Sequence, residues 1–163
     1  MKTRGIEVAL VNSNEVKFML NTPHEDINPN VLKFGYINNV IPNINDKTLV
    51  VDFGVQYAYN DEPILECRYM FHFSYREPEE AKAVISTKDG VQINDELMRT
   101  ILNIAVGAVR GIMIARTAGS QLTKFPLPIL SPSQPWTAWC QHRSHAPFLP
   151  CRHLSHPSWS CRP

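Results

Sequence analysis

Residues 48–76 have the sequence TLVVDFGVQYAYNDEPILECRYMFHFSYR, and this stretch decides the fold. Apolar and aromatic side chains occupy every second position on both sides of the polar segment Asn60-Asp61-Glu62-Pro63. Alternation with a period of two is typical of β-strands, and a short polar segment between two such runs is typical of a hairpin. The stretch therefore predicts two long strands, residues 48–59 and 64–76, that pair in antiparallel fashion.

Two further strands are predicted upstream of this hairpin. Residues 5–20 alternate, with a polar bend or bulge at Asn12-Ser13-Asn14, and residues 31–41 alternate until Pro42 ends the run. Because the connections between these strands are short, we expect a four-stranded antiparallel sheet.

The period of the apolar pattern changes after residue 93. A charged connector, residues 77–90, is expected to hold a helical turn at residues 79–85. Asn94 is a plausible N-cap, and Gly119 is a plausible stop, which gives a helix of about 24 residues, roughly 36 Å long. Its predicted buried stripe is Leu97, Ile101, Ile104, Ala108, Ile112 and Ala115. The fold class is therefore α+β, with a long helix packed on one face of the sheet.

Two glycines interrupt the helix, at positions 107 and 111. Each costs about 1 kcal/mol relative to alanine in a helix interior, so close approach of another backbone is the expected compensation. Gly107 and Gly111 either pack on the sheet of the same chain or form a helix–helix contact between subunits.

The last part of the chain has a different composition. Residues 131–163 hold all three Trp, three of the four Cys and four of the six His, and they contain no Asp, Glu or Lys. We therefore divide the chain into a folded domain, residues 1–132, and a tail, residues 133–163, that is expected to be irregular or disordered.

The tail contains two Cys-x-His pairs that could bind zinc: Cys140, His142, Cys151 and His153. This spacing is not a common structural-zinc knuckle, and the segment is dense in proline, without a helix or hairpin signal to hold the ligands. We expect no metal and no other cofactor, and keep a zinc-binding or regulatory protein as the alternative function.

The charge balance gives no reason to expect nucleic acid as a partner. Three of the 16 basic residues lie in the tail, so 13 remain in residues 1–130 against 15 acidic residues. No signal peptide is visible, and the apolar run at residues 101–115 is short for a bilayer and contains Arg110. We expect a cytoplasmic protein without integral membrane contact; Cys67, the one cysteine of the folded domain, fits a reducing compartment.

Catalysis has little support in the sequence. No Gly-rich phosphate loop follows a strand, and the acidic residues are scattered among turns and the connector. His72 and Cys67 lie on opposite faces of one predicted strand, so they cannot form a nucleophile–base pair. We expect that the protein is not an enzyme.

The order of elements and three sequence stretches resemble the SecB-like chaperone family over residues 5–132. The stretches are the strand at residues 65–73, the helix at residues 102–112, and the segment from Thr117-Ala118-Gly119 to Phe125-Pro126-Leu127-Pro128-Ile129-Leu130. The resemblance implies a dimer of dimers that holds unfolded or aggregation-prone polypeptides without ATP. It implies preproteins or antitoxins as clients, and a translocation motor as a further partner.

The resemblance also implies aromatic-lined grooves that bind the client. The residues expected to line them are Phe34, Tyr36, Phe53, Tyr57, Tyr69, Phe71, Phe73, Phe125 and Leu127, and Gly107 and Gly111 are the expected oligomer contact. Members of the family bind the export motor through an acidic face of the sheet. This chain has Glu15 in the corresponding strand, but Lys17 and Met19 follow it where a second acid would be expected.

Overall fold

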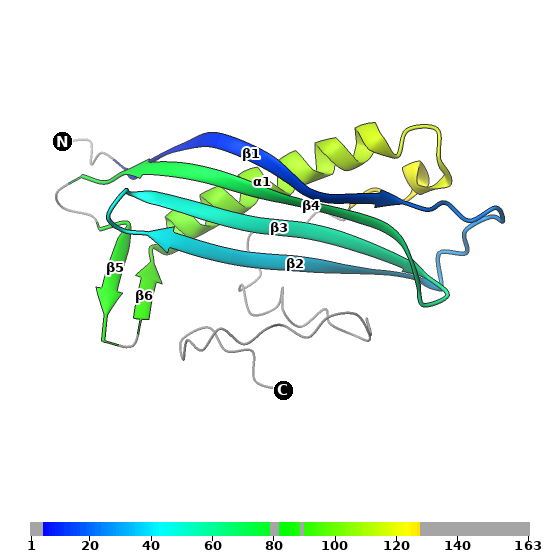
Figure 1. Ribbon diagram of the computed structural model, residues 1–163, viewed down its shortest axis with the longest axis horizontal. Coiled ribbons are helices and arrows are strands. Elements are labelled where there is room, and N and C mark those ends of the chain that lie inside the picture. Colours follow the sequence, from blue (N-terminus) through cyan, green and yellow to red (C-terminus); the bar gives the residue numbers. More distant parts are fainter. Residues whose placement is uncertain (1–4, 79–81, 89, 128–163) are drawn as a thin grey trace.

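The computed structural model of the chain describes residues 5–78, 82–88 and 90–127 (Figure 1). Four long strands come first, then a short hairpin, one long helix and a 3-10 turn. Their bounds are β1 Glu7–Leu20, β2 Leu32–Asn43, β3 Thr48–Tyr59, β4 Glu62–Arg76, β5 Val84–Thr87, β6 Gly90–Ile93, α1 Asp95–Arg116 and η1 Gln121–Lys124.

The four long strands form one antiparallel sheet in the order β1-β4-β3-β2, as the alternation predicted. The predicted hairpin between β3 and β4 turns at Asn60 and Asp61, which both have positive φ, 51° and 65°. Two consecutive residues in this region make the type of turn that matches the twist of the flanking strands. The sheet places β3 and β4 in the middle and leaves β1 and β2 as its edges.

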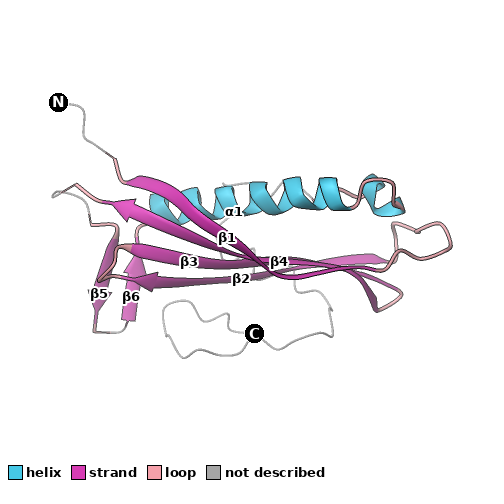
Figure 2. Ribbon diagram, turned by 45° about the horizontal axis from the view of Figure 1, so that its top comes forward, coloured by secondary structure: helices cyan, strands magenta, loops and turns pink. Residues whose placement is uncertain are grey.

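α1 lies across one face of this sheet (Figure 2). It packs chiefly on β3 and β4 and also touches β1. Beneath it, β3 and β4 bury one parity of side chains, because successive residues of a strand point to opposite faces. The largest fully buried side chains there are Phe53, Phe71, Phe73, Leu49 and Leu65. The predicted α+β fold class is confirmed.

The start of α1 is where the sequence predicted it. The Asn94 side chain accepts hydrogen bonds from the backbone N–H groups of Glu96 and Leu97, at 2.9 and 3.3 Å. The helix ends earlier than predicted, at Arg116, because the N–H and hydroxyl of Thr117 both close on the Met113 carbonyl. Gly119 has a φ of 81° and lies in the turn beyond it.

The predicted buried stripe of α1 is wrong in part. The residues that the helix buries are Leu97, Met98, Ile101, Leu102, Ala105, Val106, Val109 and Met113. Of the predicted stripe, Ile104, Ala108 and Ile112 are half-buried and Ala115 is exposed. The apolar residues extend around most of the helix, so periodicity alone left its orientation open.

Gly107 and Gly111 do not pack on the sheet. Both are exposed, and a Cβ added at either position would meet no atom of the described residues within 4 Å. The alternative of close packing within one chain is therefore excluded, and the contact between subunits stays a prediction.

β1 bends at two bulges, one of them next to the predicted polar bend. Its register with β4 shifts between Leu10 and Asn12 and again between Glu15 and Lys17. Val11 and Val16 are the extra residues, and each bulge reverses the phase of alternation. Glu15 therefore faces α1, whereas Lys17 faces the opposite side of the sheet.

The expected helical turn at residues 79–85 is wrong where the structure describes it. Val84 and Ile85 belong to β5, which pairs with β6 in a short antiparallel hairpin beside the main sheet. The β-branched residues at positions 84, 85 and 87 favour a strand. Gly90, with a φ of 134°, lies at the turn of this hairpin.

α1 is longer than the apolar run at residues 101–115 suggested. With 22 residues it is, among the described residues, the one helix long and apolar enough to cross a membrane by length and composition. In the structure its apolar side packs on the sheet, as a core helix does. The predicted domain boundary near residue 132 and the tail, residues 133–163, lie outside the described residues.

Candidate functional site

Five of the nine residues expected to bind clients are buried. Phe53, Tyr57, Phe71 and Phe73 lie in the core beneath α1, and Leu127 is buried beside them. These buried side chains could contact a client only if the core opened. They are therefore part of the core and not of a client-binding surface.

Phe34 and Tyr36 are accessible and lie together on β2. Their rings make an edge-to-face contact with centroids 5.9 Å apart, and Phe34 is 41% exposed. With Val40 they occupy the side of β2 that faces the helix layer, because they pair with Tyr57, Val55 and Val51 of β3. α1 packs chiefly on β3 and β4, so this side of β2 lies at the margin of the helix layer. We call Phe34, Tyr36 and Val40 the β2 strip.

The segment after η1 closes one end of the β2 strip. The hydroxyl of Tyr57 donates to the carbonyl of Phe125, at 3.2 Å, and Nη2 of Arg110 donates to the carbonyl of Leu127, at 2.6 Å. A cavity of about 30 Å³ remains between this segment, Met113 and Tyr57. It has room for no more than a few water molecules and not for a side chain of a client.

The polar groups at the β2 strip are shielded from water. Burial raises the pKa of Tyr36 to about 12, and the nearby positive charge of Arg110 opposes the shift only in part. Burial likewise raises the pKa of Tyr57. The hydroxyl of Tyr36 is buried and has no hydrogen-bond partner in the part of the chain that the structure describes. The strip is thus mainly apolar, but the exposed Asn38 lies on the same face between Tyr36 and Val40, and one unused donor and one cation lie beside it.

Tyr69 belongs to a different site, at the β1 side of the sheet. Its hydroxyl donates to Oε2 of Glu15 at 2.5 Å, and Nη1 of Arg116 lies 3.3 Å from the same oxygen. The Arg116 guanidinium also stacks over the ring of Phe18, 3.9 Å from its centroid. The structure therefore does not bring Tyr69 together with Phe34 and Tyr36, and Glu15 is engaged by a residue of α1.

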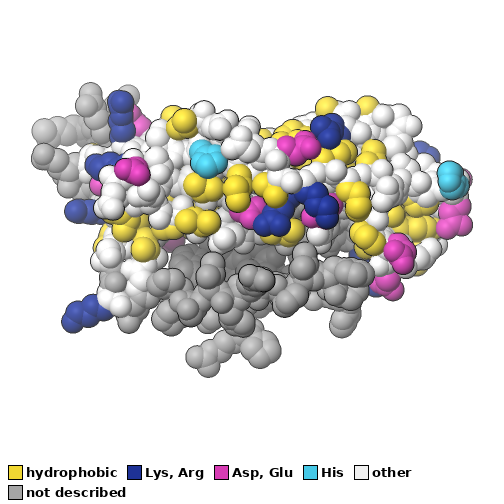
Figure 3. Space-filling model, in the orientation of Figure 1, with side chains coloured by type: hydrophobic (Ala, Val, Ile, Leu, Met, Phe, Trp, Pro, Cys, Tyr) yellow, Lys and Arg dark blue, Asp and Glu magenta, His cyan; other side chains and the backbone are white. Residues whose placement is uncertain are grey.

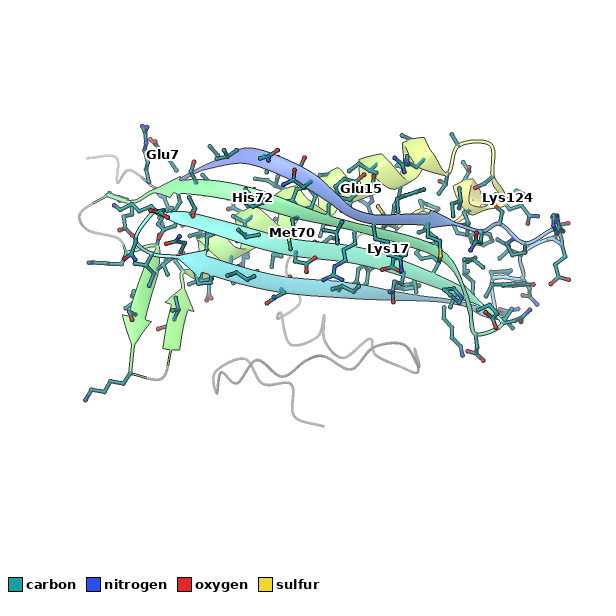
Figure 4. All side chains as sticks on the ribbon, viewed as in Figure 1. Glu7, Glu15, Lys17, Met70, His72 and Lys124 are labelled. Atoms are coloured by element: carbon teal, nitrogen blue, oxygen red, sulfur yellow. The ribbon has the colours of Figure 1, made fainter. Side chains whose placement is uncertain are left out.

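The face of the sheet opposite α1 carries paired charges (Figures 3 and 4). Arg68 donates from Nε and Nη2 to the two carboxylate oxygens of Asp52, at 2.9 and 2.5 Å, and Lys17 lies 2.5 Å from the carboxylate of Glu66. A Cβ on Gly54 would come within 3.1 Å of the Arg68 side chain, so the glycine makes room for this pair. The carboxylates of Asp52 and Glu66 are therefore each neutralised by a cation on a neighbouring strand.

The described residues show no arrangement for metal binding or covalent chemistry. None of their His, Cys, Asp and Glu side chains form a group of three or more that could hold a metal ion. Cys67 is fully buried, and burial raises the pKa of its thiol to about 11, while His72 lies on the opposite face near Asn14. The alternative zinc ligands, Cys140, His142, Cys151 and His153, lie outside the described residues.

The arrangement of one helix over an antiparallel sheet of order β1-β4-β3-β2 is a SecB-like fold. No protein-family model matches the sequence, and no curated protein matches it. The structure is similar to the solved structure of the Mycobacterium tuberculosis SecB-like chaperone Rv1957, in complex with a ChAD peptide from the Rv1956 HigA1 antitoxin. The TM-score is 0.53 at 13% identity, over 76% of this chain and 90% of that chain. A likeness at this identity is a distant structural relationship and shows the fold.

Two functional candidates were not singled out from the sequence. Arg110 looked only like a charge within an apolar run, and Val40 only like one of several strand residues. Arg110 follows Val106 by four residues and so lies on the same side of α1. Arg110 is the single charged residue of the apolar run 101–115, and this is the signal that could have indicated a contact with a neighbouring carbonyl.

Proposed function

We propose that this protein is an ATP-independent chaperone that holds unfolded or aggregation-prone polypeptides. The observation that carries the proposal is the β2 strip, an apolar and aromatic surface beside α1 that the described part of the chain leaves partly uncovered. Exposed apolar surface of this kind is a common feature of polypeptide-binding sites. The SecB-like fold and the antitoxin peptide bound by the Mycobacterium protein support the same reading.

The mechanism is reversible burial of extended apolar segments, without covalent chemistry. The partly exposed side chain of Phe34 would contact the client, and the half-buried Tyr36 and Val40 would extend this apolar contact along β2. Each buried methylene of the client contributes about 0.8 kcal/mol, so many small contacts give affinity without sequence specificity. Such a site has no need for a nucleotide or a metal, and we propose that the protein is not an enzyme and acts in the cytoplasm.

The clients fit the export or the antitoxin class, and the charges on the sheet bear on the choice. A translocation motor would need an accessible acidic face of the sheet; Glu15 faces α1, so only the face opposite α1 is left open by the helix (Figure 2). There Asp52 and Glu66 are each paired with a cation from a neighbouring strand. This arrangement favours aggregation-prone antitoxins over motor-coupled preproteins. Gly107 and Gly111 present a smooth, exposed side of α1, and we propose that subunits associate there.

Suppression of aggregation tests the proposal. The full chain is mixed with an unfolding model client, such as reduced α-lactalbumin, and light scattering is followed over time. We expect suppression by the wild type and a marked loss in Phe34→Ser. Ile41→Ser is the matched control, because Ile41 is on the same strand with a similar exposed fraction, 49%, but points to the opposite face. If a several-fold excess of the wild type did not suppress aggregation of the client, the chaperone proposal would be contradicted.

A further inference from the structure

The described chain stops beside the β2 strip. Leu127 is buried, and its carbonyl is held by Arg110. Two residues earlier, the carbonyl of Phe125 is held by Tyr57, which is the register partner of Phe34 on β2. Two hydrogen bonds therefore hold the last described residues, 125–127, at the end of the strip that Phe34 marks.

The strip itself lacks one thing that an occupant would supply. Phe34 is 41% exposed, so apolar cover over its side chain would be stabilising. The hydroxyl of Tyr36 is buried without a partner among the described residues, so it is not open to an occupant on the surface. The occupant should also be uncharged, because Arg110, the cation beside the strip, already binds Leu127.

Residues 128–139, with the sequence PILSPSQPWTAW, have this chemistry. They carry no charged side chain, and they contain Ile129, Leu130, Trp136 and Trp139. The segment contains three prolines, and proline-rich sequences favour an extended backbone. The strip from Phe34 to Val40 spans roughly 20 Å at the rise of a strand. Twelve residues at the polyproline rise reach roughly 37 Å, which is more than enough.

We propose that residues 128–139 dock on the β2 strip of their own chain. The segment would act as a tethered occupant that covers Phe34. A short tether raises the effective concentration of such a segment to about the millimolar range, so it would compete with free polypeptides for the same surface. This competition rests on the proposed chaperone function, whereas the docking itself does not. Only clients whose apolar segments bind the β2 strip more tightly than residues 128–139 do would then displace the docked segment.

Tryptophan fluorescence of the full chain reports on this segment directly. All three Trp residues lie after residue 131, so tryptophan emission, excited selectively over that of tyrosine, carries no signal from residues 1–130. In a Trp159→Phe background the two remaining indoles, Trp136 and Trp139, belong to the proposed docking segment. We expect blue-shifted emission that acrylamide quenches weakly, and the same spectrum at all protein dilutions.

Substitution of the strip completes the test. Phe34→Ser in this background should shift the emission to the red and raise the acrylamide quenching constant several-fold, whereas Ile41→Ser should leave both unchanged. Circular dichroism of each variant shows whether it is folded, and Val40→Ser provides a second strip variant if Phe34→Ser is not. Emission typical of exposed indole in the wild type, an equal response to Ile41→Ser, or a blue shift that is lost on dilution would overturn docking in cis.

The two proposals fail in different ways. If the fluorescence behaves as expected but no client is held, the docking of residues 128–139 is supported and their competition with clients is contradicted. If clients are held and the indoles are exposed throughout, the chaperone proposal stands and this one falls. If both hold, addition of an unfolded client that contains no tryptophan should shift the emission to the red, and Trp136→Ser with Trp139→Ser should increase the apparent affinity for that client.

Discussion

Phe34 and Phe53 show how differently two regions of one sheet face are used. Both are aromatic, and both point toward the helix layer from neighbouring strands. Phe53 is fully buried beneath α1, whereas Phe34, at the edge of the sheet, remains 41% exposed. The same alternation in sequence therefore serves as a core in β3 and β4 and as a surface in β2. The difference comes from where the helix lies, not from the residues.

The largest expected effect separates the core from the strip. Phe71→Ala should lower the free energy of unfolding by about 3–5 kcal/mol, because the ring is fully buried and the substitution leaves a cavity. Phe34→Ala should cost well under half of this, since much of its ring is already in contact with water. Chemical denaturation of the two variants measures both values. Similar losses would contradict the division between the two regions.

The exposed side of α1 offers a third region for this comparison. In an isolated protomer, Gly107→Ala should raise the stability by about 1 kcal/mol, because alanine favours the helix and its Cβ meets no atom of the described residues within 4 Å. In an assembly that uses this side of α1, the added methyl group should instead weaken association. Thermal melting together with solution mass distinguishes the cases. If Gly107→Ala raised the stability and left the solution mass unchanged, this would argue against a subunit contact at Gly107 and Gly111.

The smallest expected effect concerns Tyr36 at the strip. Tyr36→Phe removes a buried hydroxyl without a partner, so stability at neutral pH should rise by up to about 1 kcal/mol. The pKa of Tyr36 is raised by burial from 10.0 to about 12. The folded state therefore holds this proton more tightly, and its contribution to stability is present below pH 10 and is lost as the pH rises toward 12.

Alkaline denaturation checks the sign of this shift. Between pH 10 and 12 the wild type should lose more stability than Tyr36→Phe does, although other buried groups such as Tyr57 contribute to both. Parallel pH dependences in the two proteins would mean that the hydroxyl of Tyr36 is not shielded.

Much of the fold could be predicted because its signals are local. The alternation in residues 48–76, the turn at Asn60-Asp61 and the cap at Asn94 depend on neighbours in sequence, and all three are confirmed. The hairpin at β5 and β6 was missed because four-residue strands carry too little periodicity to compete with a charged connector. The helix stripe was only partly right, because apolar residues on nearly all sides of α1 leave several orientations open.

The candidate site was less predictable than the fold. Nine residues were named from the sequence, and four of them, Phe34, Tyr36, Tyr69 and Phe125, keep accessible surface. Alternation along a strand indicates on which face of the sheet a residue lies, but it does not indicate how much of that face the helix covers. Tyr69 lies on β4 and is separated from Phe34 on β2 by β3, and Glu15, between the two bulges of β1, is turned toward Arg116.

The sequence by itself determined the strands, their antiparallel pairing and the place where the helix begins. These follow from alternation, turn residues and capping, in which each residue acts on its near neighbours. Only the tertiary structure decided which aromatic side chains form the core and which form a surface. That choice depends on where a 22-residue helix comes to lie on the sheet, and packing between segments far apart in the chain sets it.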